Sequence, residues 1–68
     1  MNMIPVSSSN LVAAGYNPSS KELTIQFHSG VYTYVGVPQQ IFDGLMTASS
    51  KGSYHHRNIK QYPFRRGY

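Results

Sequence analysis

Residues 21–27 alternate between polar and apolar side chains, and a second strand-like stretch follows over residues 31–35. In the first stretch the apolar residues share one face of a strand: Leu23, Ile25 and Phe27. His28-Ser29-Gly30 has the length and composition of a hairpin loop. The two stretches therefore predict an antiparallel hairpin. In the second strand either face can be the core, because Val31, Thr33 and Val35 alternate with Tyr32 and Tyr34.

Further elements are predicted on both sides of this hairpin. The small apolar run from Leu11 to Tyr16 predicts a preceding strand, and Asn17-Pro18-Ser19-Ser20 has the composition of a turn. After the hairpin, Pro38 suits the first turn of a helix. Apolar residues then recur at helical spacing: Ile41, Phe42, Leu45 and Met46. Gly44 within this helix is expected to permit close packing, and residues 49–52 are expected to end it.

These patterns predict an α+β fold. We expect a three-stranded antiparallel β-meander over residues 11–35, packed by one α-helix over about residues 38–48. A short basic and aromatic C-terminal segment, helical or irregular, should return to the sheet. The expected core consists of Leu23, Ile25, Phe27, Ile41, Phe42, Leu45 and Met46.

The chain has 68 residues and no cysteine, so its core must be small and disulfides are excluded. Both faces of the strand over residues 31–35 carry apolar or aromatic side chains, and one helix covers only one face. We therefore expect self-association into a homo-oligomer.

Positive charge is concentrated in the last quarter of the chain. The formal charge is +4, with six Lys and Arg against two Asp and Glu. Residues 51–68 contain no acid, and they combine cations with rings: Lys51, Arg57, Lys60, Arg65 and Arg66, with Tyr54, Tyr62, Phe64 and Tyr68. Cations that neutralise phosphates beside rings that stack on bases are typical of nucleotide recognition. The alternative is a solvated basic tail that its aromatic residues hold against the sheet.

Several short motifs follow one another along the chain: Ser8-Ser9-Asn10-Leu11, Gly15-Tyr16-Asn17-Pro18, Tyr32-Thr33-Tyr34 after Gly30, Val37-Pro38, Ala48, Ser50-Lys51-Gly52, Tyr54, Ile59 and Tyr62-Pro63. In this order they resemble the KTSC domain family. The resemblance implies a single domain over residues 1–68, with its core at about 6–64. KTSC domains occur as short bacterial and phage proteins and at the C-terminus of some lysyl-tRNA synthetases, which suggests nucleic-acid binding. His55-His56 stands where relatives tend to carry Phe-Asn.

No catalytic set is expected from these residues. Glu22 is placed on a strand and Asp43 on a helix, so a carboxylate pair is not predicted. The serines lie in turn or cap contexts. His55 and His56 are adjacent and point to different sides in a helix or a strand, so we expect no metal site and no cofactor. The protein is expected not to be an enzyme.

Candidate ligand contacts fall into two groups. The pool for phosphate binding is Lys51, Arg57, Lys60, Arg65 and Arg66, with Lys51 first because Gly52 beside it can bring backbone donors to an anion or simply cap a helix. The pool for stacking or hydrogen bonding is Tyr32, Tyr34, Tyr54 and His55. The two strand tyrosines either pack in the core or form a flat surface for a base or a second subunit. His55 either contacts a ligand or is exposed without a role.

Three functions remain open. The first is a non-catalytic protein that captures a phosphate-bearing nucleotide, by analogy with phage proteins that sequester nucleotide immune signals, including cyclic ones. The second is a module that binds single-stranded RNA or another nucleic acid. The third is a self-assembling structural or adaptor module.

The protein is expected to lie in the cytoplasm, or in the host cytoplasm if a phage encodes it. Residues 1–6 lack the basic start and apolar stretch of a signal peptide, and no apolar run approaches the roughly 18 residues of a membrane span. No membrane partner is expected.

Overall fold

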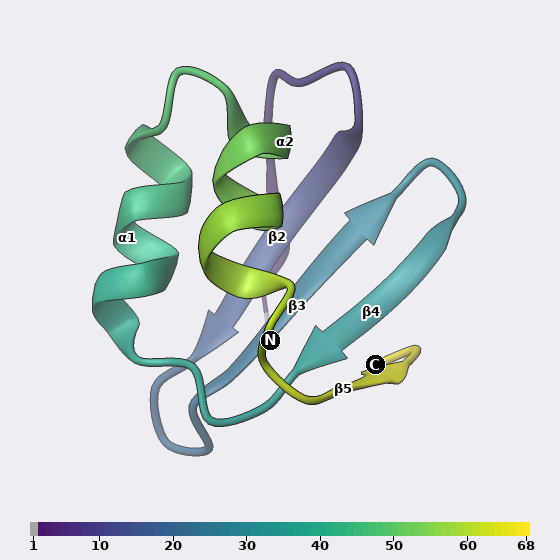
Figure 1. Ribbon diagram of the computed structural model, residues 1–68. Helices are drawn as coiled ribbons and strands as arrows, with labels where there is room; N and C mark the ends of the chain where they lie inside the picture. Colours follow the sequence, from purple (N-terminus) through teal and green to yellow (C-terminus); the bar gives the residue numbers. More distant parts are fainter. Residues whose placement is uncertain (1) are drawn as a thin grey trace.

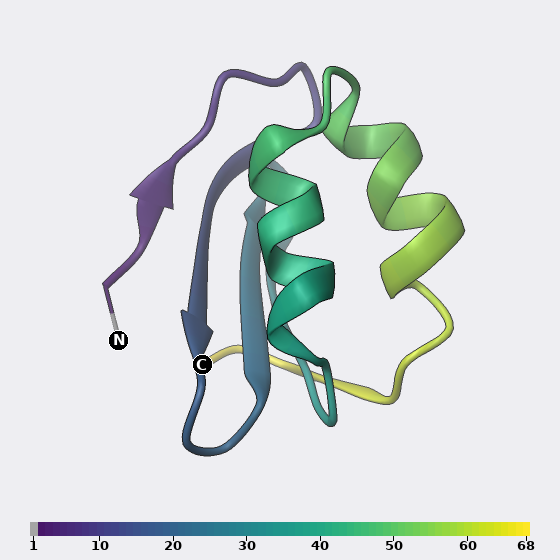
Figure 2. The same ribbon diagram turned by 90° about the vertical axis from the view of Figure 1, so that its left-hand side faces the viewer.

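The computed structural model describes residues 2–68, so residue 1 of the expected domain lies outside the described part. A five-stranded antiparallel sheet has the strand order β1-β2-β3-β4-β5. The strands are β1 (Ile4–Pro5), β2 (Leu11–Asn17), β3 (Glu22–Phe27), β4 (Gly30–Tyr34) and β5 (Phe64–Arg66). Helix α1 (Gln39–Thr47), helix α2 (Lys51–Tyr54) and the π-helical turn η1 (His55–Ile59) follow β4 (Figure 1). Figure 2 shows the helices on one side of the sheet.

The predicted α+β class and the central meander are confirmed, but the predicted numbers of strands (three) and of helices (one) are wrong. The sheet gains an edge strand at each end, β1 and β5, and a second helix begins at Lys51. The helix expected over about residues 38–48 agrees with α1 to within one residue at each end, but residues 49–52, expected to end it, instead contain the start of α2. Helix α1 ends at Thr47, whereas Ser50 caps α2 by accepting a hydrogen bond from the Ser53 backbone N–H at 3.4 Å.

The core lies between the helices and the β3 face that carries Leu23 and Ile25. Both side chains are fully buried, as predicted, and so is Leu45 of α1. The other predicted core residues are half-buried and pack against this cluster: Phe27, Ile41, Phe42 and Met46. The cluster also contains Tyr34, whose place in the core the sequence left open, and buried residues that the sequence patterns missed: Leu11, Ala14, Val37 and Ile59.

Strand β4 turns its tyrosine face toward the helices. Leu23 pairs with Tyr34 and Ile25 pairs with Tyr32 across the β3–β4 ladder, so the tyrosines share the core face. The Tyr34 hydroxyl lies 2.7 Å from Nε2 of His55, and the imidazole also packs edge-on against Phe27. Burial, with Lys60 and His56 nearby, lowers the pKa of His55. Burial raises the pKa of Tyr34, so both groups are held neutral.

The second helix changes pitch after its first turn. Residues 55–59 form a π-turn, closed by a hydrogen bond from the Lys60 backbone N–H to the His55 carbonyl at 2.9 Å. At its two ends, His55 reaches Tyr34 and Ile59 is fully buried in the core.

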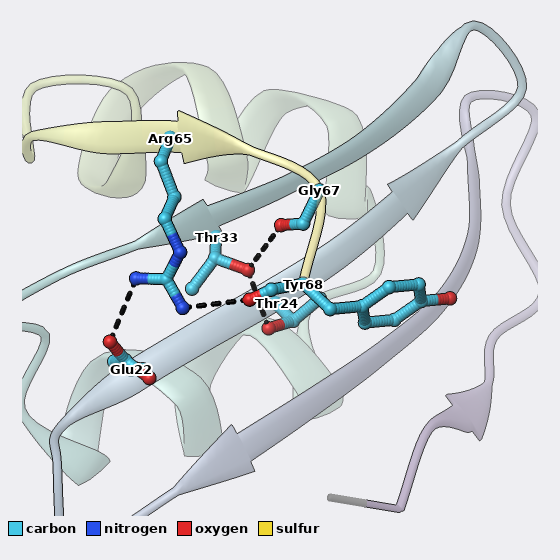
Figure 3. Close-up of polar contacts among 6 residues, drawn as sticks. All are labelled: Glu22, Thr24, Thr33, Arg65, Gly67 and Tyr68. Atoms are coloured by element: carbon cyan, nitrogen blue, oxygen red, sulfur yellow. Dashed lines mark hydrogen bonds and ion pairs between the residues drawn. The ribbon is translucent and has the colours of Figure 1, made fainter.

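The opposite face of the sheet is closed by the C-terminal residues (Figure 3). The buried Thr33 hydroxyl donates to the Gly67 carbonyl at 2.7 Å, and it therefore accepts from Thr24, 2.9 Å away. Arg65 donates to Glu22 at 2.8 Å and to the Tyr68 carbonyl at 2.7 Å. The face of β4 that was expected to remain open thus has a polar, covered centre, and self-association stays a prediction.

We predict that Gly44→Ala destabilises the fold. A methyl group at Gly44 would overlap the Tyr54 hydroxyl and lie 2.7 Å from Cζ of that ring. Helix propensity alone favours alanine by up to ~1 kcal/mol, whereas overpacking costs ~1–3 kcal/mol, so a net loss of up to about 2 kcal/mol in the free energy of unfolding is expected in urea denaturation. In a Tyr54→Ala background the same substitution should be neutral or stabilising. An equal loss in both backgrounds would contradict this packing.

We also predict that the fold loses stability as the pH falls from about 7 to 5. The pKa of His55 in the folded chain lies below its ordinary value of 6.5. Between these two values the unfolded chain binds more protons than the folded chain, so the free energy of unfolding decreases as the pH decreases. The measurement is thermal unfolding across this range. His55→Gln should flatten the dependence and His56→Gln should preserve it; a wild-type profile without a slope would refute the prediction.

Candidate functional site

A hollow of about 750 Å³ lies where the loop before β2 meets the start of α2. We call it the serine pocket, because two serine-rich segments supply most of its lining. One segment is Ser7, Ser8, Ser9 and Asn10, and the other contributes Ser49, Ser50, Lys51, Gly52, Ser53, His56 and Arg57.

Local hydrogen bonds and one close contact shape the two segments. The Ser8 hydroxyl accepts from the backbone N–H groups of Asn10 and Leu11 at 3.3 and 3.4 Å, which fixes the turn into β2. Gly52 has no side chain, and this allows Asn10 to approach. A Cβ at Gly52 would lie 2.7 Å from Nδ2 of Asn10. A larger residue at this position would therefore require the Asn10 amide to shift.

The charges that line the serine pocket are all potentially positive. Lys51, Arg57 and His56 contribute to its wall, and none of its lining residues is Asp or Glu. The Lys51 ammonium donates one hydrogen bond to the Ala48 carbonyl at 2.9 Å, which holds it beside the pocket and leaves two N–H donors for a ligand. Hydroxyl groups, an amide and two permanent cations are suited to binding an anion with several acceptor oxygens.

A second hollow, the aromatic pocket, lies between β4, β5 and η1. It has a volume of about 310 Å³, and its lining comprises Phe27, Ser29, Tyr32, Tyr34, His55, Lys60, Phe64 and Arg66. Tyr32 packs edge-on against Phe27 and Phe64, at centroid distances of 5.7 and 5.6 Å. Phe64 is 56% exposed, so much of this ring is available to a planar ligand group.

A third hollow of about 330 Å³, the connecting pocket, lies between these two. It shares Asn10 and Gly52 with the serine pocket, and it shares Phe27, Ser29 and His55 with the aromatic pocket. His28 and Leu11 complete its lining. The three pockets therefore adjoin one another around the helix formed by residues 51–59.

The predicted phosphate contacts are divided among three places. Lys51 and Arg57 line the serine pocket, whereas Lys60 and Arg66 line the aromatic pocket. Arg65 lies on the opposite face of the sheet, because neighbouring residues of a strand point to opposite faces. There Arg65 is bonded to Glu22, and this contact raises the pKa of Arg65 and lowers that of Glu22 (Figure 3).

Three of the four predicted stacking residues line the aromatic pocket: Tyr32, Tyr34 and His55. Tyr34 is buried, and its hydroxyl is already within hydrogen-bonding distance of His55. Tyr54 lines neither the serine nor the aromatic pocket, and its ring packs against Gly44 of α1.

The two adjacent imidazoles do not converge on one point. His55 packs among Phe27 and Tyr34, whereas His56 lines the serine pocket. Within residues 2–68, no three His, Cys, Asp or Glu side chains are grouped so that they could hold a metal ion.

The sequence reasoning missed most of the serine pocket and part of the aromatic pocket. Its serines were interpreted as turn and cap residues, although both serine-rich segments belong to the motifs that carry the family resemblance. Their occurrence in two motif segments was the available signal. Asn10, Phe27 and Ser29 were also missed, whereas Phe64 belongs to the basic and aromatic segment that the sequence singled out but was not placed in the stacking pool.

The chain was compared with known proteins. A protein of Tsukamurella paurometabola is 41% identical over 59 residues, which is 85% of this chain and 88% of that protein. A protein of Stutzerimonas stutzeri is 32% identical over 66 residues, covering 96% of this chain and 93% of the relative. A lysine–tRNA ligase of a Nostoc species is 44% identical over 46 residues, covering 66% of this chain but 8% of the ligase.

The crystal structure of a KTSC domain protein from Yersinia pestis matches the fold with a TM-score of 0.95 and 38% identity, covering 98% of this chain and 97% of that one. The KTSC domain itself matches residues 7–64, a range that includes both serine-rich segments. The chain therefore belongs to the KTSC domain family.

Proposed function

We propose that this protein is a non-catalytic binding protein that captures a phosphate-bearing nucleotide. The observation that carries the proposal is the serine pocket, which combines hydroxyl groups with Lys51 and Arg57 and has no acidic residue in its lining. A phosphate offers several acceptor oxygens and a negative charge, so hydroxyl, ammonium and guanidinium donors complement it. Arg57 is exposed, and its planar guanidinium can hold two phosphate oxygens at once.

The adjoining aromatic pocket favours a nucleotide over free phosphate. Aromatic rings bind bases by stacking, and this interaction contributes about 1–3 kcal/mol per base and accepts every base. The proposed ligand places its phosphate in the serine pocket, with its base toward the exposed ring of Phe64. Binding of this kind needs no reacting side chain. In a phage-infected cell, such a protein would lower the free concentration of a nucleotide signal by sequestering it.

Single-stranded RNA is a second candidate ligand, because one relative is a lysine–tRNA ligase. Exposed cations and rings suit unpaired bases better than a duplex. The chain matches 8% of that enzyme, so the ligase activity itself is not proposed for this chain. The described residues contain no helix long and apolar enough to cross a membrane. We propose the cytoplasm as the place where this ligand is met.

We predict that Lys51→Ala and Arg57→Ala each weaken nucleotide binding by ~1.5–3 kcal/mol, because each removes a charged hydrogen bond. The ligand is first identified by incubating the protein with a nucleotide panel or cell extract and then determining by mass spectrometry what stays bound. Calorimetry on the folded variants then measures the loss of affinity. Lys21→Ala is the matched control, because it removes an exposed cation that lines none of the three pockets. Undiminished binding in both pocket variants would refute this site, and no retained nucleotide would refute the function.

Salt dependence separates the two candidate ligands. Binding of single-stranded RNA should weaken by ~0.7 log units per log unit of salt for each phosphate neutralised, whereas a small nucleotide in a pocket should respond weakly. We expect the weak response, measured by fluorescence titration between low and physiological salt. A steep slope with a uridine oligonucleotide, together with tighter binding of longer strands, would favour the RNA alternative.

A further inference from the structure

The cations at the three adjoining pockets lie on both sides of a region that contains the rings. Lys51 and Arg57 line the serine pocket at one end, and Lys60 and Arg66 line the aromatic pocket at the other. The connecting pocket between them has no Lys or Arg in its lining. A ligand that occupies all three pockets therefore meets a pair of cations at each end, with rings and polar groups between the two pairs.

We propose that the ligand carries two phosphate groups separated by a nucleoside, as in a nucleoside 3′,5′-bisphosphate or a dinucleotide. This inference rests on the proposed function and adds a second phosphate position to it. The first phosphate lies in the serine pocket beside Lys51 and Arg57. The nucleoside passes the connecting pocket and places its base against Phe64 and Tyr32. The second phosphate lies beside Lys60 and Arg66.

The strand pairing supports this second position. Arg66 lies opposite Tyr32 in the β4–β5 ladder, and Phe64 lies opposite Tyr34. The Arg66 cation and these three rings therefore share the helix-side face of the sheet. Lys60 follows η1 directly and lines the same pocket. Arg65, between Phe64 and Arg66 in β5, points to the other face and is bonded to Glu22. Of the two arginines, only Arg66 is therefore positioned to meet the ligand.

The test compares two isomeric nucleotides that differ only in where the second phosphate is attached. Adenosine 3′,5′-bisphosphate carries its phosphates on either side of the nucleoside, whereas ADP carries both on the same side. The same pair of nucleotides is also tested with guanosine, cytidine and uridine, so that the comparison does not rest on the choice of one base. We expect calorimetry at fixed ionic strength to give at least tenfold tighter binding of the bisphosphate for the preferred base.

Variants locate the second phosphate. Lys60→Ala and Arg66→Ala should each weaken binding of the bisphosphate about tenfold and leave ADP binding within about twofold. Arg65→Ala removes a neighbouring cation on the other face and should leave the affinity for both probes unchanged. Phe64→Leu keeps an apolar side chain at an exposed position and should weaken binding of both probes. Circular dichroism and thermal unfolding confirm that each variant is folded.

The outcomes separate this inference from the function on which it rests. Equal affinities for the two probes, or equal effects of Lys60→Ala on both, would overturn the second phosphate position while ADP binding still supports nucleotide capture. Failure of every probe pair to bind would overturn both proposals.

Discussion

Leu23 and Ile25 on the central strand are fully buried, and the rest of the structure is arranged to keep them so. The buried side chains of Leu45 and Ile59, one from each helical segment, belong to the same cluster. Full burial of such a side chain contributes about 1.5–3 kcal/mol, a large share of the stability that a small domain can reach. Both helices lie on this face, as Figure 2 shows, so neither covers the other face.

The opposite face is therefore completed by a different kind of interaction. Thr24 and Thr33 are buried without a helix above them, and their hydroxyls are satisfied by each other and by the Gly67 carbonyl. The backbone N–H of Gly67 also donates to the Val31 carbonyl at 2.8 Å, so the last residues extend the pairing begun by β5. Residues 64–68 thus cover the buried hydroxyl groups on the face of the sheet that carries no helix.

The parts of the fold that the sequence predicted are those in which a polar and apolar pattern repeats several times. Residues 21–27 and the apolar stripe of α1 repeat often enough to reveal a strand and a helix. Strands β1 and β5 contain two and three residues, too few to show any alternation, and their place is decided by the free edges of β2 and β4. Ile59 was missed because the π-turn departs from the spacing of 3.6 residues that a helical stripe assumes.

The same limits apply to the candidate site. Charge composition, with a neighbouring glycine at Lys51 and the planar guanidinium of Arg57, made these two residues the first candidates for phosphate contact. Composition also grouped Arg65 and Arg66 together. Once that segment is a strand, alternation sends the two arginines to opposite faces. The serine pocket was not predicted, because serine is common in turns and only tertiary structure brings residues 7–10 and 49–53 together.

The π-turn at residues 55–59 holds one residue more than an α-helical turn, because the Lys60 backbone N–H donates to the His55 carbonyl five residues before it. Loss of one residue here would let the turn close as an α-helical turn, and the later residues would keep their direction around the helix axis. Ile59 would then remain in the core while His55 stays beside Tyr34. A relative one residue shorter in this stretch is therefore able to keep both contacts.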